Sequence, residues 1–190
     1  MIKADLLGIN TLEEWYKSIV DQQEQAHGEH YCAMHNAIQE CLSESKTYKE
    51  LGTMQGGTAA AALFSTPYPI RVDLVDINMS RFNPHRHLFD DWCSKNDVEL
   101  NVMECDSRHP DCVSEVDVLL IDSVHLRPHM ESELKVHANT VQKYIIFHDT
   151  TARLDLAQGI QKFCSRINPW VLHEKFLPNV GYTVLKRVGS

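Results

Sequence analysis

The sequence lacks a long apolar run, a CxxC pair and an excess of basic residues, and each absence excludes a class of protein. No apolar run in the 190 residues approaches the ~20 that a membrane span needs. None of the six cysteines pairs with another at CxxC spacing, so we expect small buried thiols rather than a zinc knuckle. The N-terminal segment carries acidic residues where a signal peptide would be apolar. These features predict a cytoplasmic protein with no membrane partner.

Glycine and proline are also scarce, and the charge balance is acidic. Eight glycines and seven prolines exclude a collagen-like or low-complexity chain. Lysine and arginine number 18 against 26 acidic residues, a formal charge of −8, which argues against nucleic acid as a partner bound through a broad electrostatic surface. A chain of this length predicts one domain, residues 1–190, with a core that needs no disulfide or metal.

Two helices are predicted to lead the chain, within residues 1–45. Thr11 can cap the first helix, with Glu14 as the return partner of a capping box, and the second covers Glu29–Glu44. From residue 46 to 190, short runs rich in Val, Ile and Leu alternate with helical stretches. The predicted strands are Tyr48–Leu51, Val72–Asp76, Val98–Met103, Val116–Ile121 and Tyr144–Phe147, and the predicted helices between and after them are Thr58–Ser65, Pro84–Lys95, Pro128–Val141 and Leu154–Ile167.

A last pair of strands, Trp170–Phe176 and Val180–Arg187, is joined by too few residues for a parallel crossover and must be antiparallel. The alternation of strands and helices predicts a doubly wound α/β fold. Its sheet should have seven strands, mostly parallel, with one reversed strand near the C-terminus.

Acidic side chains and a glycine-rich loop follow the predicted strands, where open α/β sheets bind ligands. Glu50 precedes a loop that contains Gly52, Thr53, Gly56 and Gly57, and the later strand ends carry Asp76, Asp106 with Ser107, Asp122 with His125, and His148 with Asp149. The loop lacks a basic residue and matches neither GxGxxG nor a phosphate-binding loop. Asp76 suits a ribose diol. The pattern favours a nucleoside that needs no phosphate.

These motifs resemble class I S-adenosylmethionine (SAM)-dependent methyltransferases, in particular small O-methyltransferases of the group that includes cephalosporin-hydroxylase-like and macrolide-sugar enzymes. The similar stretch covers about Lys46–Arg187, and its matches are YKELGTMQGGTAAAAL, RVDLVDIN, NVMECDS, VDVLLIDSVH, KYIIFHDT and VGYTVLKR. The chain departs from the family pattern where Ser123 replaces a glycine, at residues 139–142 in place of a Gly-Gly turn, and at Leu126 and Arg127 in place of an aromatic residue.

The resemblance implies a Rossmann-like core and a role for each strand-end residue. Gly52, Thr53, Gly56 and Gly57 would hold the methionine end of SAM near Glu50, Asp76 the ribose, and Asp106 and Ser107 the adenine, while Asp122, His125, His148 and Asp149 would face the transferred methyl group. The histidines His129 and His137 fall on a predicted helix outside this site.

Methylation of a hydroxyl needs a base or a metal ion. His125 is the preferred base and His148 the alternative, while Asp122 and Asp149 are candidate ligands for Mg²⁺. Asp149 could instead cap a helix near residues 151–153. We predict a SAM-dependent O-methyltransferase with a small-molecule substrate. The alternatives are a SAM-binding protein without activity and an NAD- or nucleotide-binding module. The leading helices or a second subunit of a homo-oligomer would cover the site.

Overall fold

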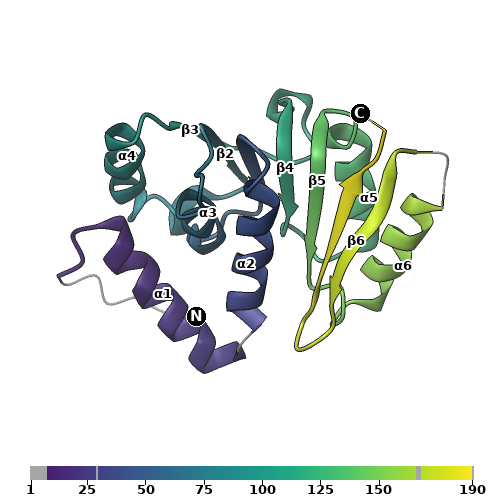
Figure 1. The fold of residues 1–190 in the computed structure, drawn as a ribbon, viewed down its shortest axis with the longest axis horizontal. Helices are drawn as coiled ribbons and strands as arrows, with labels where there is room; N and C mark the ends of the chain where they lie inside the picture. The colour runs from purple at the N-terminus through teal and green to yellow at the C-terminus, as the bar shows by residue number, and fades with distance from the viewer. Residues whose placement is uncertain (1–7, 29, 166–167, 190) are drawn as a thin grey trace.

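The computed structural model describes residues 8–28, 30–165 and 168–189 (Figure 1). The helices are α1 (Leu12–His27), α2 (His30–Leu42), α3 (Gly57–Leu63), α4 (Arg86–Lys95), α5 (Arg127–His137) and α6 (Leu154–Cys164), with two 3₁₀ turns, η1 (Met79–Arg81) and η2 (Pro110–Cys112). The strands are β1 (Thr47–Leu51), β2 (Arg71–Asp76), β3 (Glu99–Glu104), β4 (Val116–Ile121), β5 (Val141–His148), β6 (Trp170–Phe176) and β7 (Tyr182–Arg187). Within the described residues, no helix combines the length and the apolar character that crossing a membrane requires.

All seven strands form one sheet in the order β3-β2-β1-β4-β5-β7-β6. The pairs among β1 to β5 are parallel, and β7 runs antiparallel to both of its neighbours, β5 and β6. The predicted doubly wound, mostly parallel sheet with one reversed strand is therefore confirmed. Because the chain winds outward in both directions from β1 and β4, the switch point of the sheet lies between these two strands.

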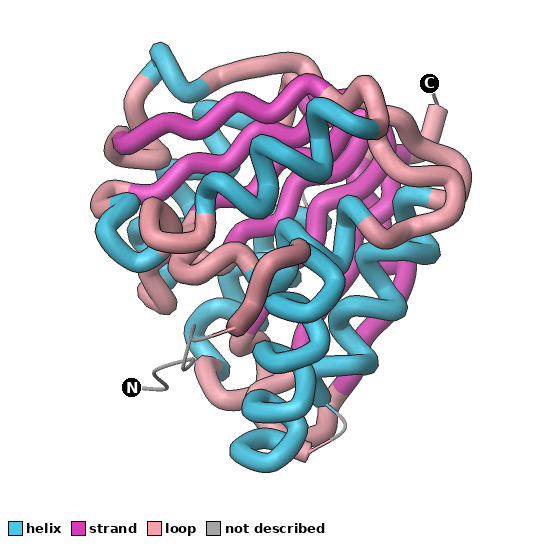
Figure 2. Tube along the Cα trace, turned by 90° about the vertical axis from the view of Figure 1, so that its left-hand side faces the viewer, coloured by secondary structure: helices cyan, strands magenta, loops and turns pink. Residues whose placement is uncertain are grey.

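Helices cover both faces of the sheet, and side chains alternate between two cores. One core joins α1 to α4 with residues such as Tyr48, Val72 and Leu120, whereas the other joins α5 and α6 with residues such as Leu119 and Ile145. Figure 1 shows the first group of helices on the left of the sheet, and Figure 2 views the molecule from that side.

The start of α1 matches the predicted cap with one difference. Thr11 accepts a hydrogen bond from the backbone N–H of Glu14 at 3.2 Å. The Glu14 carboxylate, however, accepts from the backbone N–H of Asn10 at 2.9 Å rather than from Thr11. The side chain thus reaches one residue further back than a capping box requires.

The largest boundary error lies between α5 and β5. The prediction continued the helix to Val141, but α5 ends at His137 and β5 already begins at Val141. The backbone N–H and the hydroxyl of Thr140 both donate to the carbonyl of His137 at 2.9 Å, which closes the helix with a turn. Two other predicted boundaries lie outside the described part of the chain: the start of the second helix at Glu29 and the end of the last helix at Ile167.

Candidate functional site

A cavity of about 530 Å³ lies where the parallel strands end. Its walls come from the loop after β1, the residues that follow β2 to β5, and the two leading helices through Ile19, Gln23, Tyr31 and Met34. The volume is in the range of small-molecule sites. The leading helices therefore contribute to the wall of the cavity.

The glycine-rich loop and Asp76 lie directly against each other. One carboxylate oxygen of Asp76 accepts from the backbone N–H of Met54 in the loop at 2.9 Å, and the other accepts from the N–H of Asn78 at 3.0 Å. The loop and Asp76 both line the cavity. Asp76 thereby fixes the position of the loop as well as facing the cavity.

Gly52 allows the ends of β1 and β4 to approach closely. Its φ of +94° lies in the region that favours glycine, and a Cβ at this position would collide with the backbone carbonyl of Asp122. Gly57 lies beneath the hydroxyl of Tyr31, which occupies the space that a side chain there would need. Thr53, between these glycines, has a buried hydroxyl that makes no hydrogen bond with any described residue.

Two of the proposed cofactor residues lie behind the wall rather than in it. Glu50 is fully buried and accepts from the hydroxyl of Tyr48 at 2.7 Å. Burial raises the pKa of Glu50 to about 8, and the negative charges of Asp122 and Asp76 act in the same direction. Gly56 packs against the rings of Phe82 and Phe89.

Asp106 and Ser107 line the cavity, and each already has a partner in the protein. Both carboxylate oxygens of Asp106 accept from the guanidinium of Arg108, at 2.9 and 2.6 Å, which lowers the pKa of Asp106 well below its usual range. The hydroxyl of Ser107 donates to Glu133 at 2.5 Å.

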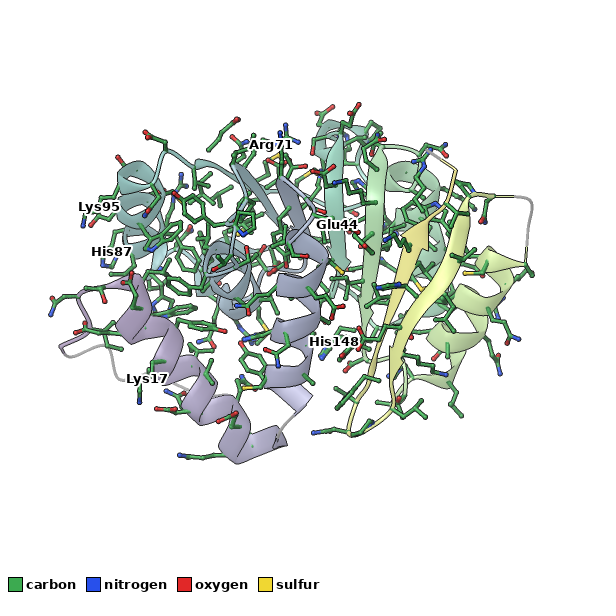
Figure 3. All side chains as sticks on the ribbon, viewed as in Figure 1. Lys17, Glu44, Arg71, His87, Lys95 and His148 are labelled. Atoms are coloured by element: carbon green, nitrogen blue, oxygen red, sulfur yellow. The ribbon has the colours of Figure 1, made fainter. Side chains whose placement is uncertain are left out.

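Two imidazole–carboxylate pairs converge at the ends of β4 and β5. His125 Nδ1 lies 2.5 Å from Asp149 Oδ2, and His148 Nδ1 lies 2.8 Å from Asp122 Oδ1. The second nitrogen of His125, Nε2, lies 4.0 Å from Asp122 Oδ1, and His148 Nδ1 lies 3.4 Å from Asp149 Oδ1. All four residues line the cavity, and Figure 3 labels His148 at the end of β5.

The carboxylates raise the pKa of both histidines. For His125 the largest cause is the hydrogen bond with Asp149. Burial lowers the pKa of His148, but the charge of Asp122, the hydrogen bond to it and the charge of Asp149 outweigh burial. Each carboxylate therefore stabilises a proton on its imidazole, which is how a buried acid orients and supports a general base.

The alternative role of Asp149 as a helix cap is wrong. Residues 150–152 form a turn, and α6 begins only at Leu154, with Arg153 at its cap position. Asp149 itself has a φ of +59°, a conformation that aspartate tolerates better than most residues.

Several side chains of the site were not predicted. His129, expected outside the site, lines the cavity, as do Ser123 and Tyr31. His129 and the buried Glu133 are four residues apart on α5, so their side chains lie on the same face of the helix. The sequence showed a helix here, but no local signal indicated which face of it turns towards the strand ends.

Neither the models of known protein families nor the curated protein sequences match this chain. Solved structures do share its fold. The O-methyltransferase TomG from Streptomyces achromogenes, in complex with SAM, is 13% identical over 83% of this chain and 80% of its own, with a TM-score of 0.57. The methyltransferase PaMTH1 from Podospora anserina, bound to S-adenosylhomocysteine (SAH), is 13% identical over 99% of this chain and 89% of its own, with a TM-score of 0.63.

A third structure, TrmK from M. capricolum in complex with SAH, is 12% identical over 82% of this chain and 68% of its own, with a TM-score of 0.55. The resemblance inferred from the motifs is thus confirmed at the level of the fold. This chain has the Rossmann-like α/β fold of SAM-dependent methyltransferases.

Proposed function

We propose that the protein is a SAM-dependent methyltransferase that transfers the methyl group to a hydroxyl of a small molecule. The observation that carries the proposal is the cavity itself, because it brings the glycine-rich loop, Asp76 and the His125–Asp149 pair to one edge of the sheet. Proteins with the same fold were solved with SAM or SAH at 12 to 13% identity. Only the fold is shared at that identity, so the chemistry is argued from the residues.

The walls of the cavity fit a nucleoside with an amino-acid tail. Asp76, beside the glycine-rich loop, is the proposed ribose ligand, and the hydroxyl of Thr53, which bonds to none of the described residues, is available to the methionine end. Asp106 and Ser107 stand at the end of β3, where the adenine is expected. When bound, SAM supplies an activated methyl group, so the chain's own residues need only align the acceptor and remove its proton.

His125 is the proposed general base. Its Nδ1 faces Asp149, so Nε2 is the nitrogen that can take the proton of an acceptor hydroxyl. The His125 side chain is 39% exposed, whereas that of His148 is 18% exposed and held against Asp122. Exposure to the cavity therefore favours His125 over His148 as the base.

Binding of SAH to the purified protein tests the cofactor assignment. We expect calorimetry to detect binding of SAH and no binding of NAD. Asp76→Ala should weaken SAH binding about 10- to 100-fold, because the variant loses two hydrogen-bond acceptors that serve the ribose and the loop. Asp21→Ala is the matched control, since Asp21 is an exposed partner of Lys17 on α1. An unchanged affinity in Asp76→Ala would place the ribose elsewhere, and binding of NAD but not SAH would refute the assignment.

A screen of hydroxylated metabolites with SAM, read by mass spectrometry for the gain of one methyl group, tests the transfer reaction. A protein that binds SAH but methylates none of the hydroxylated compounds, under conditions that saturate the cofactor site, would support the alternative of a SAM-binding protein without activity.

Metal assistance is the second candidate mechanism. Asp122 and Asp149 are its proposed Mg²⁺ ligands, and ligand atoms of Asp122, His125 and His148 lie within 4.8 Å of one another. Such oxygen and imidazole donors can hold a divalent ion, which would lower the pKa of an acceptor hydroxyl when bound. In the structure, however, an oxygen of each carboxylate faces an imidazole at 2.5 to 2.8 Å.

We therefore expect turnover to persist after treatment with EDTA, because the His125–Asp149 pair can remove the proton without an ion. Calorimetric titration of Mg²⁺ and of Mn²⁺ into the treated protein, and into Asp122→Ala, provides an independent readout. Loss of turnover in EDTA that either ion restores, together with saturable binding that Asp122→Ala abolishes, would instead establish the metal mechanism.

A further inference from the structure

A buried carboxylate lies behind the cavity wall and joins the ends of β3 and β4. Glu133, on α5, has no exposed side-chain surface. Its Oε1 accepts from the hydroxyl of Ser107, after β3, and from the hydroxyl of Ser123, after β4, each at 2.5 Å. His129 Nε2 lies 3.3 Å from the same oxygen. Ser107, Ser123 and His129 line the cavity, whereas Glu133 stands behind them.

A hydroxyl has a single hydrogen to donate, and these two serines have given theirs to Glu133. What remains on each serine oxygen is the capacity to accept, and the oxygen of Ser107 also lies 3.3 Å from His129 Nε2. The wall formed by Ser107 and Ser123 therefore presents lone pairs to a ligand, and the 2.5 Å hydrogen bonds to Glu133 hold the two hydroxyls in that orientation.

The orientation does not depend on whether Glu133 is ionised. Its second oxygen, Oε2, is buried and makes no hydrogen bond with any described residue. Burial raises the pKa of Glu133, and a proton bound to the group would reside on Oε2 and leave Oε1 as the acceptor. The same α5 face also fixes the backbone at this point, because His137 Nε2 lies 2.7 Å from the carbonyl oxygen of Ser107.

We propose that Glu133 is a positioning residue that makes the cavity select a 6-aminopurine over a 6-oxopurine. The exocyclic amino group of adenine can donate to the lone pairs of Ser107 and Ser123, whereas the oxygen of a 6-oxopurine would place its own lone pairs against them. The inference rests on the proposed SAM site, with the adenine at the end of β3. It deepens that assignment by naming Glu133 as the residue that orients the hydroxyls facing the base.

The test compares SAH with S-inosylhomocysteine, its 6-oxo analogue, by calorimetry. We expect the unmodified protein to prefer SAH by at least about 10-fold, since unpaired polar groups discriminate strongly. Glu133→Leu should reduce the preference below about 3-fold, because the released hydroxyls can then donate or accept. Glu133→Gln should retain the preference, because its carbonyl oxygen can still accept from both serines. Glu131→Gln, which alters a partly exposed carboxylate of the same helix, is the matched control.

The outcomes separate this inference from the proposed function. Failure of the unmodified protein to bind SAH would refute the function, whereas equal binding of both ligands would refute only the role of Glu133. A folded Glu133→Leu variant that keeps the full preference would refute it too. If that variant does not fold, the double variant Ser107→Ala with Ser123→Ala must lose the preference, and retention would overturn the proposal.

Discussion

Replacing Asp149 with asparagine should lower kcat by about 10³- to 10⁴-fold, the scale seen when the carboxylate of a catalytic acid–histidine pair loses its charge. Asp149 Oδ2 lies 2.5 Å from His125 Nδ1, so the carboxylate sets which nitrogen of His125 is free for the acceptor and stabilises the proton taken up. Asparagine tolerates the φ of +59° at this position better than alanine, so the backbone strain changes little. Single-turnover and steady-state methylation of the acceptor found in the metabolite screen would measure the loss.

The affinity for SAH separates a catalytic role of Asp149 from a structural one. We expect it to stay within about threefold of the unmodified protein, because Asp149 acts on the acceptor side. Asp91→Ala, at an exposed position on α4, is the control and should retain full kcat. Full activity in Asp149→Asn would remove Asp149 from the mechanism, and a parallel loss of SAH binding would make its role structural.

The fold was predictable because its signals are local. Runs such as Val116–Ile121 crowd β-branched and aliphatic residues without polar alternation, as strands covered on both faces do. Once the strands are placed, parallel topology brings their carboxyl ends to one edge. The meeting of Asp76, Asp122, His125 and Asp149 around one cavity follows from that topology.

The second layer of the site was not predictable because its contacts join distant residues. Ser107 and Glu133 are 26 positions apart, and their contact depends on the rotation of α5 about its own axis. The amphipathic pattern of that helix is blurred by buried polar residues, including Glu133 and His137, which interrupt its apolar face. A sequence pattern assigns the buried face of a helix from the spacing of its apolar residues, so a face that buries polar side chains is assigned wrongly.

Glu50 predicts a large dependence of stability on pH. Its folded-state pKa of about 8 lies above the ordinary value of 4.5, because the carboxyl is buried beside Tyr48 with Asp122 and Asp76 as nearby negative charges. Between these two values the unfolded chain has released a proton that the folded protein keeps. The contribution of Glu50 is therefore fully present below about pH 4.5 and is lost as the pH rises towards 8, at about 1.4 kcal/mol per unit.

Glu50→Gln should remove this slope, because the amide resembles the protonated carboxyl and has no proton to lose. The free energy of unfolding of Glu50→Gln minus that of the unmodified protein should grow by about 4–5 kcal/mol between pH 4.5 and pH 9. This value is an upper bound set by the full pKa difference. Urea unfolding at several pH values measures it, and Glu40→Gln, at an exposed position on α2, should show no such change. A difference that is independent of pH would mean that Glu50 is already ionised in the folded protein, with solvent or a cation reaching it from the cavity side.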